Sequence, residues 1–274
     1  MSFSCPTILV FDSGLGGLTV YREVAKARAD ARFVYAADDA VFPYARLNEE
    51  TLVARVLDVL ARLIAAHRPD LVVVACNTAS TIVLPTLRAR FAVPFVGTVP
   101  AIKPACASSK SKLVSVLGTE ATVKREYTHA LIREFGAGCA VTLVGSPELA
   151  GLAERDLRGD TISDQAIAAE IAPCFVADGE RRTDTVVLAC THYPLLLDRL
   201  ERLAPWRVAF LDPAPAIARR VVDLIGPPTG PPAAAPTRMV FTSGRPTAAL
   251  VGVLAAFGIG EGASEPFDMT SPGA

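Results

Sequence analysis

The sequence lacks the patterns that would place it in several common classes of protein. Its 274 residues contain no Cys-x-x-Cys or His-x-x-x-His spacing, so no metal site is expected. Six cysteines without an apolar leader do not predict the disulfide framework of a secreted protein. The net charge is −1 and no apolar run has the length of a membrane span, so neither direct nucleic-acid binding nor membrane contact is predicted. We therefore expect a cytoplasmic protein with reduced thiols.

Short β-rich runs alternate with longer amphipathic runs along most of the chain. This alternation is typical of a mostly parallel sheet whose strands are joined by right-handed helical crossovers. The clearest helix is expected over 48–67, with Asn48 as its N-cap, and another over 122–135, ended by Gly136. Strands are expected at 7–12, 32–37, 71–75, 95–98, 113–117, 141–144, 186–189, 207–211 and 239–241.

The two halves of the chain have similar beginnings. Residues 8–14 and 113–119 each read as a strand followed by a tight turn of small polar groups. We therefore predict an α/β fold with two similar lobes related by a pseudo-twofold axis. Each lobe is expected to be a mostly parallel sheet flanked by helices, with the active site in the cleft between them. The expected lobes are 1–99 plus 211–274 and 100–210; within the first, 226–236 is expected to be irregular and the tail from Gly260 frayed.

Two cysteines occur in matching frames. The run Val-Val-Val-Ala-Cys ends at Cys76, and the run Val-Val-Leu-Ala-Cys ends at Cys190. Each frame has the length of a buried strand, and ligands bind open α/β sheets at the carboxyl ends of strands. A facing pair of thiols suits the removal of a proton from one side of a carbon and the delivery of a proton to the other. The remaining cysteines are expected to be buried as small apolar residues: Cys5, Cys106, Cys139 and Cys174.

Polar segments follow the first two expected strands. Asp12 ends the first strand, where its carboxylate could orient an ammonium group or tune a thiol. The glycine-rich segment 13–17 lacks the third glycine of a dinucleotide loop and the Gly-Lys ending of a P-loop, which favours a tight strand-to-helix turn. The segment 38–44 is either a polar loop held by a proline or, through Tyr44 and nearby amides, part of a carboxylate site.

Small hydrogen-bonding residues begin the helix after each candidate cysteine. They are suited to cap it, and the N-terminus of a helix also favours a bound carboxylate or a thiolate. His192 alone among the three histidines lies two residues from a candidate cysteine. Glu154, taken as an isolated acid, is expected at the surface. The helix-initiating residues are Asn77 and Thr78 in the first frame and Thr191 and His192 in the second.

These residues belong to a longer series of motifs that resembles the cofactor-independent aspartate/glutamate racemase family. Within it, the run Cys-Thr-His-Tyr-Pro from Cys190 is similar to the glutamate racemases. Two positions depart from the family pattern, because Ala45 and Ala189 replace glycines. A methyl group at Ala45 is tolerated only where φ is negative, and Ala189 is expected to narrow the pocket slightly. The motifs lie at residues 11–17, 43–44, 75–79, 97–101, 118–122 and 190–195.

The resemblance implies reversible inversion at the α-carbon of glutamate without a cofactor, supplying D-glutamate for peptidoglycan. It assigns Cys76 to the D-isomer and Cys190 to the L-isomer, assisted by Asp12 and His192 respectively. Residues expected to hold the substrate are Asp12, Ser13, Pro43, Tyr44, Ala45, Asn77, Thr78, Thr119, Thr122, Thr191 and His192, with Asp38 and Glu154 as weaker auxiliary candidates.

Several alternatives stay open on the sequence alone. The same chemistry could serve another amino acid such as aspartate, and a cysteine-nucleophile hydrolase would need only one of the two frames. A homodimer and a contact with DNA gyrase, which some glutamate racemases are reported to inhibit, are expectations from the family alone. Only eleven residues precede Asp12, so we expect no long N-terminal extension of the kind carried by members activated by a cell-wall nucleotide.

Overall fold

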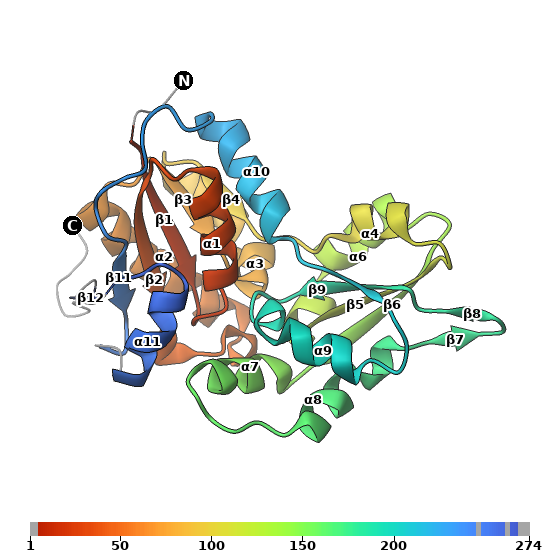
Figure 1. Ribbon diagram of the computed structural model, residues 1–274. Helices are drawn as coiled ribbons and strands as arrows, with labels where there is room; N and C mark the ends of the chain where they lie inside the picture. Colours follow the sequence, from red (N-terminus) through yellow and green to blue (C-terminus); the bar gives the residue numbers. More distant parts are fainter. Residues whose placement is uncertain (1–4, 245–247, 261–263, 268–274) are drawn as a thin grey trace. The chain divides into compact units, whose positions relative to one another are not determined.

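The computed structural model describes residues 5–244, 248–260 and 264–267 and divides into two compact units (Figure 1). Unit 1 comprises residues 1–98 together with 214–274, and unit 2 comprises residues 99–213. Both boundaries lie within a few residues of those expected from the sequence. None of the helices in the described part of the chain combines the length and the apolar composition that crossing a membrane requires.

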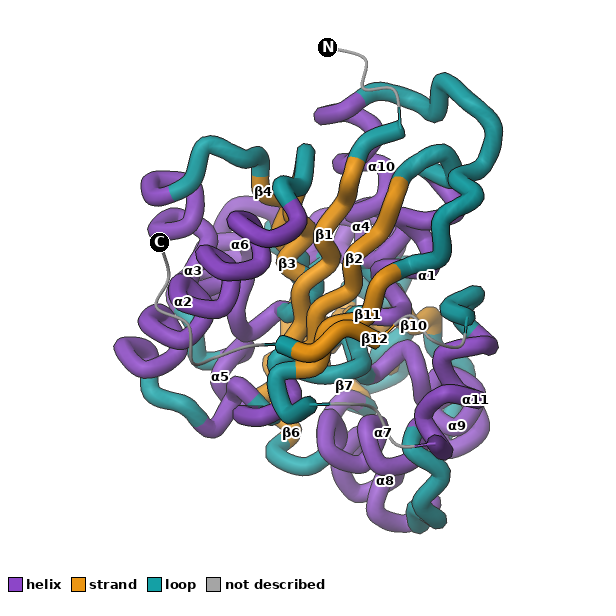
Figure 2. Tube along the Cα trace, turned by 90° about the vertical axis from the view of Figure 1, so that its left-hand side faces the viewer, coloured by secondary structure: helices purple, strands orange, loops and turns teal. Residues whose placement is uncertain are grey.

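A parallel six-stranded sheet forms the centre of unit 1 (Figure 2). Its strands are β1 (Thr7–Asp12), β2 (Arg32–Ala37), β3 (Leu71–Val74), β4 (Phe95–Gly97), β11 (Arg238–Phe241) and β12 (Ser264–Pro266), in the order β12-β11-β2-β1-β3-β4. Helices α2 (Glu49–His67) and α3 (Asn77–Arg90) pack on one face, while α1 (Leu18–Ala27) and α10 (Ala214–Ile225) lie side by side on the other (Figures 1 and 2). Helix α11 (Ala248–Ala256) lies near β11 (Figure 1). Every strand pair in this sheet is parallel, as predicted.

Local sequence explains the main elements of unit 1. Every residue of β1 after Thr7 is buried, which is the pattern of a strand covered on both faces. Asn48 caps α2 as predicted, because its side chain accepts a hydrogen bond from the backbone N–H of Thr51 at 2.8 Å. The apolar stripe of α2 then packs on the β1 face together with α3. The segment 226–236 contains no helix or strand, as expected.

Unit 2 repeats this architecture with a four-stranded parallel sheet. Its strands are β5 (Leu113–Thr119), β6 (Ala140–Ser146), β9 (Thr185–Ala189) and β10 (Ala209–Leu211), in the order β10-β9-β5-β6. One face carries α4 (Ile102–Ser108) and α6 (Glu126–Phe135); the other carries α7 (Leu149–Leu157), α8 (Asp164–Ile171) and α9 (Leu197–Leu203). Along β9, Val187 and Ala189 face α4 and α6. Leu188 and the following Cys190 face the side of α7, α8 and α9. This alternation points the Cys190 thiol toward α7.

Four details differ from the sequence-based expectation. The helix predicted over 122–135 is broken into α5 (Glu120–Val123) and α6: Arg125 is extended between them, and the Thr128 hydroxyl donates to the Thr122 carbonyl that a continuous helix would use. A short antiparallel hairpin, β7 (Ala177–Asp178) with β8 (Arg181–Arg182), carries charged residues without an apolar pattern. The tail predicted to fray pairs β12 with β11 instead, while 261–263 and 268–274 lie outside the described residues. Cys5 is exposed and Cys139 half-buried; only Cys106 and Cys174 are buried as predicted.

Candidate active site

Each candidate cysteine follows a strand that pairs with the first strand of its own unit. Cys76 comes two residues after β3, which pairs with β1. Cys190 comes directly after β9, which pairs with β5. Both residues are buried, with 6% of Cys76 and 7% of Cys190 exposed. Each unit therefore holds one thiol at the equivalent point of its sheet, at the carboxyl ends of parallel strands where ligands bind in such folds.

The Cys76 thiol lies beside Ser13 at the start of α3. Its Sγ is 3.7 Å from the Ser13 Oγ, and Cys76 is the N-cap residue of the helix. Asn77, the first helical residue, is only 2% exposed, yet neither polar atom of its side chain has a hydrogen-bond partner among the described residues. A buried amide without partners costs about 1–3 kcal/mol. The Asn77 amide is thus suited to pair with the polar groups of a ligand.

The loop between β1 and α1 is a tight turn built around Asp12. The Asp12 Oδ2 accepts a hydrogen bond from the Gly17 N–H at 2.8 Å, and Asp12 is fully buried. A β-carbon at Gly17 would stand 2.8 Å from the Asp12 Cβ and 2.9 Å from the Tyr35 Oη, so only glycine fits this close approach. Because this N–H already binds Asp12, the geometry supports the turn interpretation rather than a phosphate loop.

Asp38 is the centre of a hydrogen-bonded network rather than a free carboxylate. It accepts from the Tyr44 hydroxyl at 2.6 Å, from the Arg55 Nη2 at 2.6 Å and from the Thr242 hydroxyl at 2.7 Å. Burial first, and then the charge of Asp38, raise the pKa of Tyr44 well above its usual range. Tyr44 therefore stays protonated and donates to Asp38. Its hydroxyl is committed to this network, which leaves the backbone of 43–45 as the part of this segment that could meet a carboxylate.

The Cys190 thiol begins a chain of charged groups within unit 2. The His192 Nδ1 lies 4.0 Å from the Cys190 Sγ, and its Nε2 lies 2.9 Å from the Glu154 Oε2. The other carboxylate oxygen, Oε1, accepts from the Arg158 Nε at 3.1 Å and from its Nη2 at 2.8 Å. Glu154 is only 5% exposed, so the surface position expected for an isolated acid was wrong.

The burial of His192 and its two polar neighbours, Cys190 and Glu154, shift its pKa. Burial alone would lower its pKa, but hydrogen bonds to Cys190 and Glu154 and the charges of both raise the pKa of His192 well above its usual value. The neighbouring Tyr193 is fully buried, and that burial, followed by the charge of Cys190, raises the pKa of its hydroxyl well above the usual range. This direction favours the protonated form of His192, which lies between a thiol and a carboxylate.

The remaining predicted residues lie near one cysteine or the other within the two units. The Thr119 and Thr122 hydroxyls lie 3.0 Å apart, and Thr119 caps α5 through the Thr122 N–H at 3.2 Å. Thr78 and Thr191 are buried beside their cysteines, each 4% exposed. Ala45 is not among the described non-glycine residues with positive φ, so its methyl group fits the backbone as expected.

Ala189 corrects one sequence-based expectation. Its side chain is fully buried in the apolar layer formed by α4 and the opposite face of the sheet, whereas Cys190 faces α7. The methyl group therefore packs in the core instead of narrowing a pocket.

Two arginines in these networks were missed by the sequence analysis. Arg55 lies on α2 and reaches Asp38, which is 17 residues away, so no local signal identifies it. Arg158 follows Glu154 by four residues, which is the spacing of an ion pair on one helix face. That spacing could have identified Arg158 as a partner of Glu154. The pair is of functional interest only because Glu154 is buried beside His192, which the sequence does not show.

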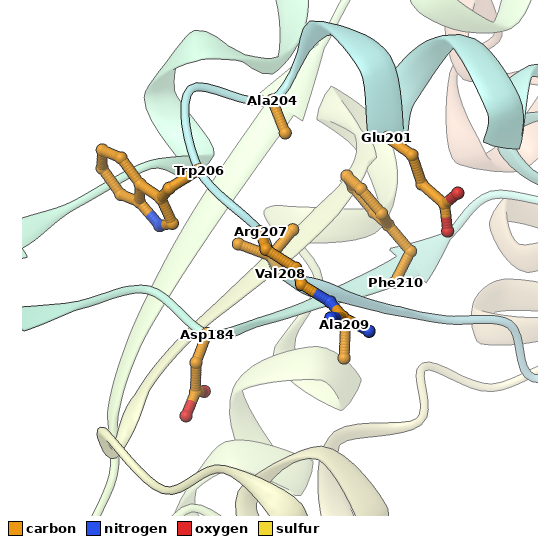
Figure 3. A pocket seen from close by; sticks show the side chains of 8 residues that line it. All are labelled: Asp184, Glu201, Ala204, Trp206, Arg207, Val208, Ala209 and Phe210. Carbon is orange, nitrogen blue, oxygen red and sulfur yellow. The ribbon is translucent and has the colours of Figure 1, made fainter.

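A hollow in the described part of unit 2 lies away from Cys190 (Figure 3). It has a volume of about 720 Å³ and surrounds the segment that leads into β10, with Trp206, Val208 and Phe210 in its wall. Asp184, which precedes β9, also lines it, whereas Cys190 follows the other end of that strand. The hollow therefore lies at the amino ends of β9 and β10, whereas Cys190 lies at the carboxyl end of β9.

Comparison with known proteins agrees with this arrangement. The sequence model of the family described as Asp/Glu/Hydantoin racemase matches residues 8–221. A glutamate racemase of Mesorhizobium japonicum is 51% identical over 254 residues, which cover 92% of this chain and 97% of the relative. A glutamate racemase of Brucella ovis is 56% identical over 219 residues, which cover 80% of this chain and 79% of the relative.

A solved structure resembles the whole chain. The crystal structure of Escherichia coli glutamate racemase, in complex with L-glutamate and the activator UDP-MurNAc-Ala, has a TM-score of 0.84 and 39% identity. The match covers 95% of this chain and 97% of the relative. The fold and these relatives thus define a two-unit α/β isomerase. The chain belongs to the Asp/Glu/Hydantoin racemase family.

Proposed function

We propose that the chain interconverts L-glutamate and D-glutamate, with Cys76 and Cys190 as the two acid–base groups of one active site. One thiolate takes the α-proton onto its sulfur, and the opposite thiol gives its proton to the other face of the carbanion. Two groups are needed because inversion requires protonation from the face opposite the departure. A thiol suits both steps, since its ordinary pKa of about 8.5 lies near the working pH.

The observation that carries this proposal is the pair of equivalent thiols, each backed by its own polar neighbours. The relatives that match most of the chain are named glutamate racemases, and that substrate is carried over here as part of the proposal. Cys190 acts on the L-isomer beside the cation of His192, and Cys76 acts on the D-isomer with help from Asp12. These directions follow the family resemblance.

The carbanion is the difficult species, because an amino-acid α-proton is far less acidic than a thiol. We assign its stabilisation to donors arranged around the substrate carboxylate and to exclusion of water. The unpaired Asn77 amide and the N-terminus of α3 support this part of the proposal. The other substrate contacts proposed are Ser13, the backbone of Pro43, Tyr44 and Ala45, Thr78, Thr119, Thr122 and Thr191; Asp38 and Glu154 act as auxiliaries through Tyr44 and His192.

In the cell, the proposed product is D-glutamate for peptidoglycan, made in the cytoplasm without a cofactor. A homodimer and a contact with DNA gyrase remain predictions from the family resemblance.

The direct test is incubation of L-glutamate with metal-free and pyridoxal-free protein in D2O. Optical rotation and the α-proton NMR signal would be followed together. We expect rotation to fall to zero while deuterium enters the α-position. A folded, reduced protein that changes neither signal would refute the glutamate racemase proposal. A panel with aspartate and hydantoins then identifies a racemase of another substrate.

A cysteine-nucleophile hydrolase is the second candidate. The hydrogen-bonded series Cys190–His192–Glu154 favours it, because these residues could act in turn as nucleophile, base and orienting acid. It leaves the Cys76 half-site without a role. Mass spectrometry after incubation with activated glutamyl esters would distinguish the two: a covalent acyl group on Cys190 supports the hydrolase, and an unmodified enzyme that racemises glutamate rejects it.

A further inference from the structure

The carboxylate of Glu154 is held from two sides. His192 occupies one oxygen, Oε2, at 2.9 Å, and Arg158 occupies the other, Oε1, through two nitrogens at 2.8 and 3.1 Å. A carboxylate is a rigid planar group, so fixing one oxygen fixes the direction in which the other accepts. The Glu154 side chain has three rotatable bonds, and without Arg158 it could turn toward water.

We infer that Arg158 is a positioning residue of the racemase reaction: its guanidinium holds Glu154 so that Glu154 orients the His192 ring toward the Cys190 thiol. This inference rests on the proposed function. Within the described part of unit 2, Arg158 binds Glu154 rather than Cys190, so its effect on that thiol passes through Glu154 and His192.

The charge of Arg158 adds an electrostatic effect to its positioning role. With Cys190 as thiolate, Glu154 and Cys190 carry two negative charges against the single positive charge of His192. Arg158, whose side chain is 35% exposed, adds a second positive charge, which offsets part of the cost of holding a thiolate beside a carboxylate.

An ordinary surface ion pair is the simpler interpretation of a Glu–Arg pair four residues apart. Two observations argue against it. The Glu154 side chain is only 6% exposed, and its second oxygen binds the histidine beside the candidate thiol. The chain also offers a matched pair for comparison, because Arg62 binds Asp58 with the same spacing on α2, where Asp58 is 44% exposed.

The kinetic test compares Arg158→Met with Arg62→Met. We expect Arg158→Met to lower kcat on the order of tenfold with little change in KM, since Arg158 does not touch the substrate, and Arg158→Lys to recover part of the loss. Because a racemisation has an equilibrium constant of one, kcat/KM falls equally in both directions. The kinetic isotope effect measured with 2-deuterated L-glutamate, whose deuteron Cys190 removes, should nevertheless increase. This increase should be larger than the one measured with 2-deuterated D-glutamate.

The titration of His192 separates positioning from simple charge. The chain has three histidines, so their ring signals can be assigned by NMR with one variant each. If Arg158 positions Glu154, Arg158→Met lets the carboxylate turn away and the pKa of His192 falls. If Arg158 acts only as a positive charge, its loss raises the pKa of His192, and the inference is overturned.

Unchanged kinetics in Arg158→Met beside an active wild type would equally overturn it, as would an effect matched by Arg62→Met. A wild type that leaves glutamate unchanged refutes the proposed function instead, and the His192 titration still decides whether Arg158 positions Glu154.

Discussion

At the scale of single residues, the two thiols have different surroundings but the same importance for racemisation. Cys76 lies beside Ser13, and Cys190 lies beside the charged row that begins with His192. We expect Cys76→Ser and Cys190→Ser each to lower racemisation by at least about a thousandfold, because a hydroxyl is a far weaker acid and base than a thiol at neutral pH. Polarimetry in both directions checks this. Wild-type rates in either variant would contradict the two-thiol mechanism.

Asn77 offers a second residue-scale prediction. Its buried amide has no partner in the described part of the chain, so Asn77→Ala removes no hydrogen bond that the folded protein makes. We expect the melting temperature to stay level or rise while kcat/KM for glutamate falls on the order of a hundredfold. Asn48→Ala is the control, because Asn48 caps α2 and its loss should cost about 1 kcal/mol without affecting activity. A lower stability of Asn77→Ala with full activity would assign the amide to folding.

His192 makes stability depend on pH. Its folded-state pKa is raised above the unfolded value of about 6.5, so protonation of His192 favours the folded state. This contribution is fully present below about pH 6.5 and is lost as the pH rises through the raised folded-state pKa. The difference in unfolding free energy between wild type and His192→Gln should therefore shrink from neutral to alkaline pH. Urea titrations at a series of pH values measure it; a difference that grows with pH would mean that His192 is neutral in the fold.

At the scale of elements, the strands were predictable and the partners of the polar residues were not. Buried parallel strands such as β1 are continuous apolar runs, so all the strands expected from the sequence occur, whereas the short strands β7, β8 and β12 were missed. Asp12, Cys76 and Cys190 were found because they end such runs. Arg55 was missed because its partner Asp38 is brought to it only by the packing of α2 on the sheet. The break between α5 and α6 involves a side-chain hydrogen bond from Thr128, which helix periodicity does not register.

That hydroxyl gives the element-scale prediction. Thr128 is fully buried and donates to the Thr122 carbonyl at 2.7 Å, so it fixes the short helix α5 that presents Thr119 and Thr122. Thr128→Val keeps the shape and removes the donor, which should destabilise the protein by about 1–3 kcal/mol and raise KM for glutamate. Thr128→Ser retains the donor and should keep a normal KM. An unchanged KM in Thr128→Val would show that α5 holds its place without this bond.

At the scale of the whole molecule, the chain leaves unit 1 after residue 98 and returns to it at 214. The return is anchored by Arg28, whose guanidinium is fully buried, binds Asp30 at 2.8 Å and donates to the carbonyls of Ile225 and Gly226 at the end of α10. Arg28 thus supplies a cation where the C-terminal carbonyls of α10 need one. This ion pair also lowers the pKa of Asp30, so Asp30 remains charged in the fold.

Loss of this anchor should affect one unit and spare the other. Arg28→Met leaves Asp30 buried without its partner and should destabilise unit 1 by about 3–5 kcal/mol, whereas Arg28→Met with Asp30→Asn should recover part of that loss. Hydrogen exchange followed by mass spectrometry is the appropriate readout, because it resolves α1 and α10 from the peptides of unit 2. We expect faster exchange in α1 and α10 and unchanged exchange in β5 and β9. Equal acceleration in both units would mean that the chain unfolds as one cooperative body, and that the return of the chain stabilises the entire molecule.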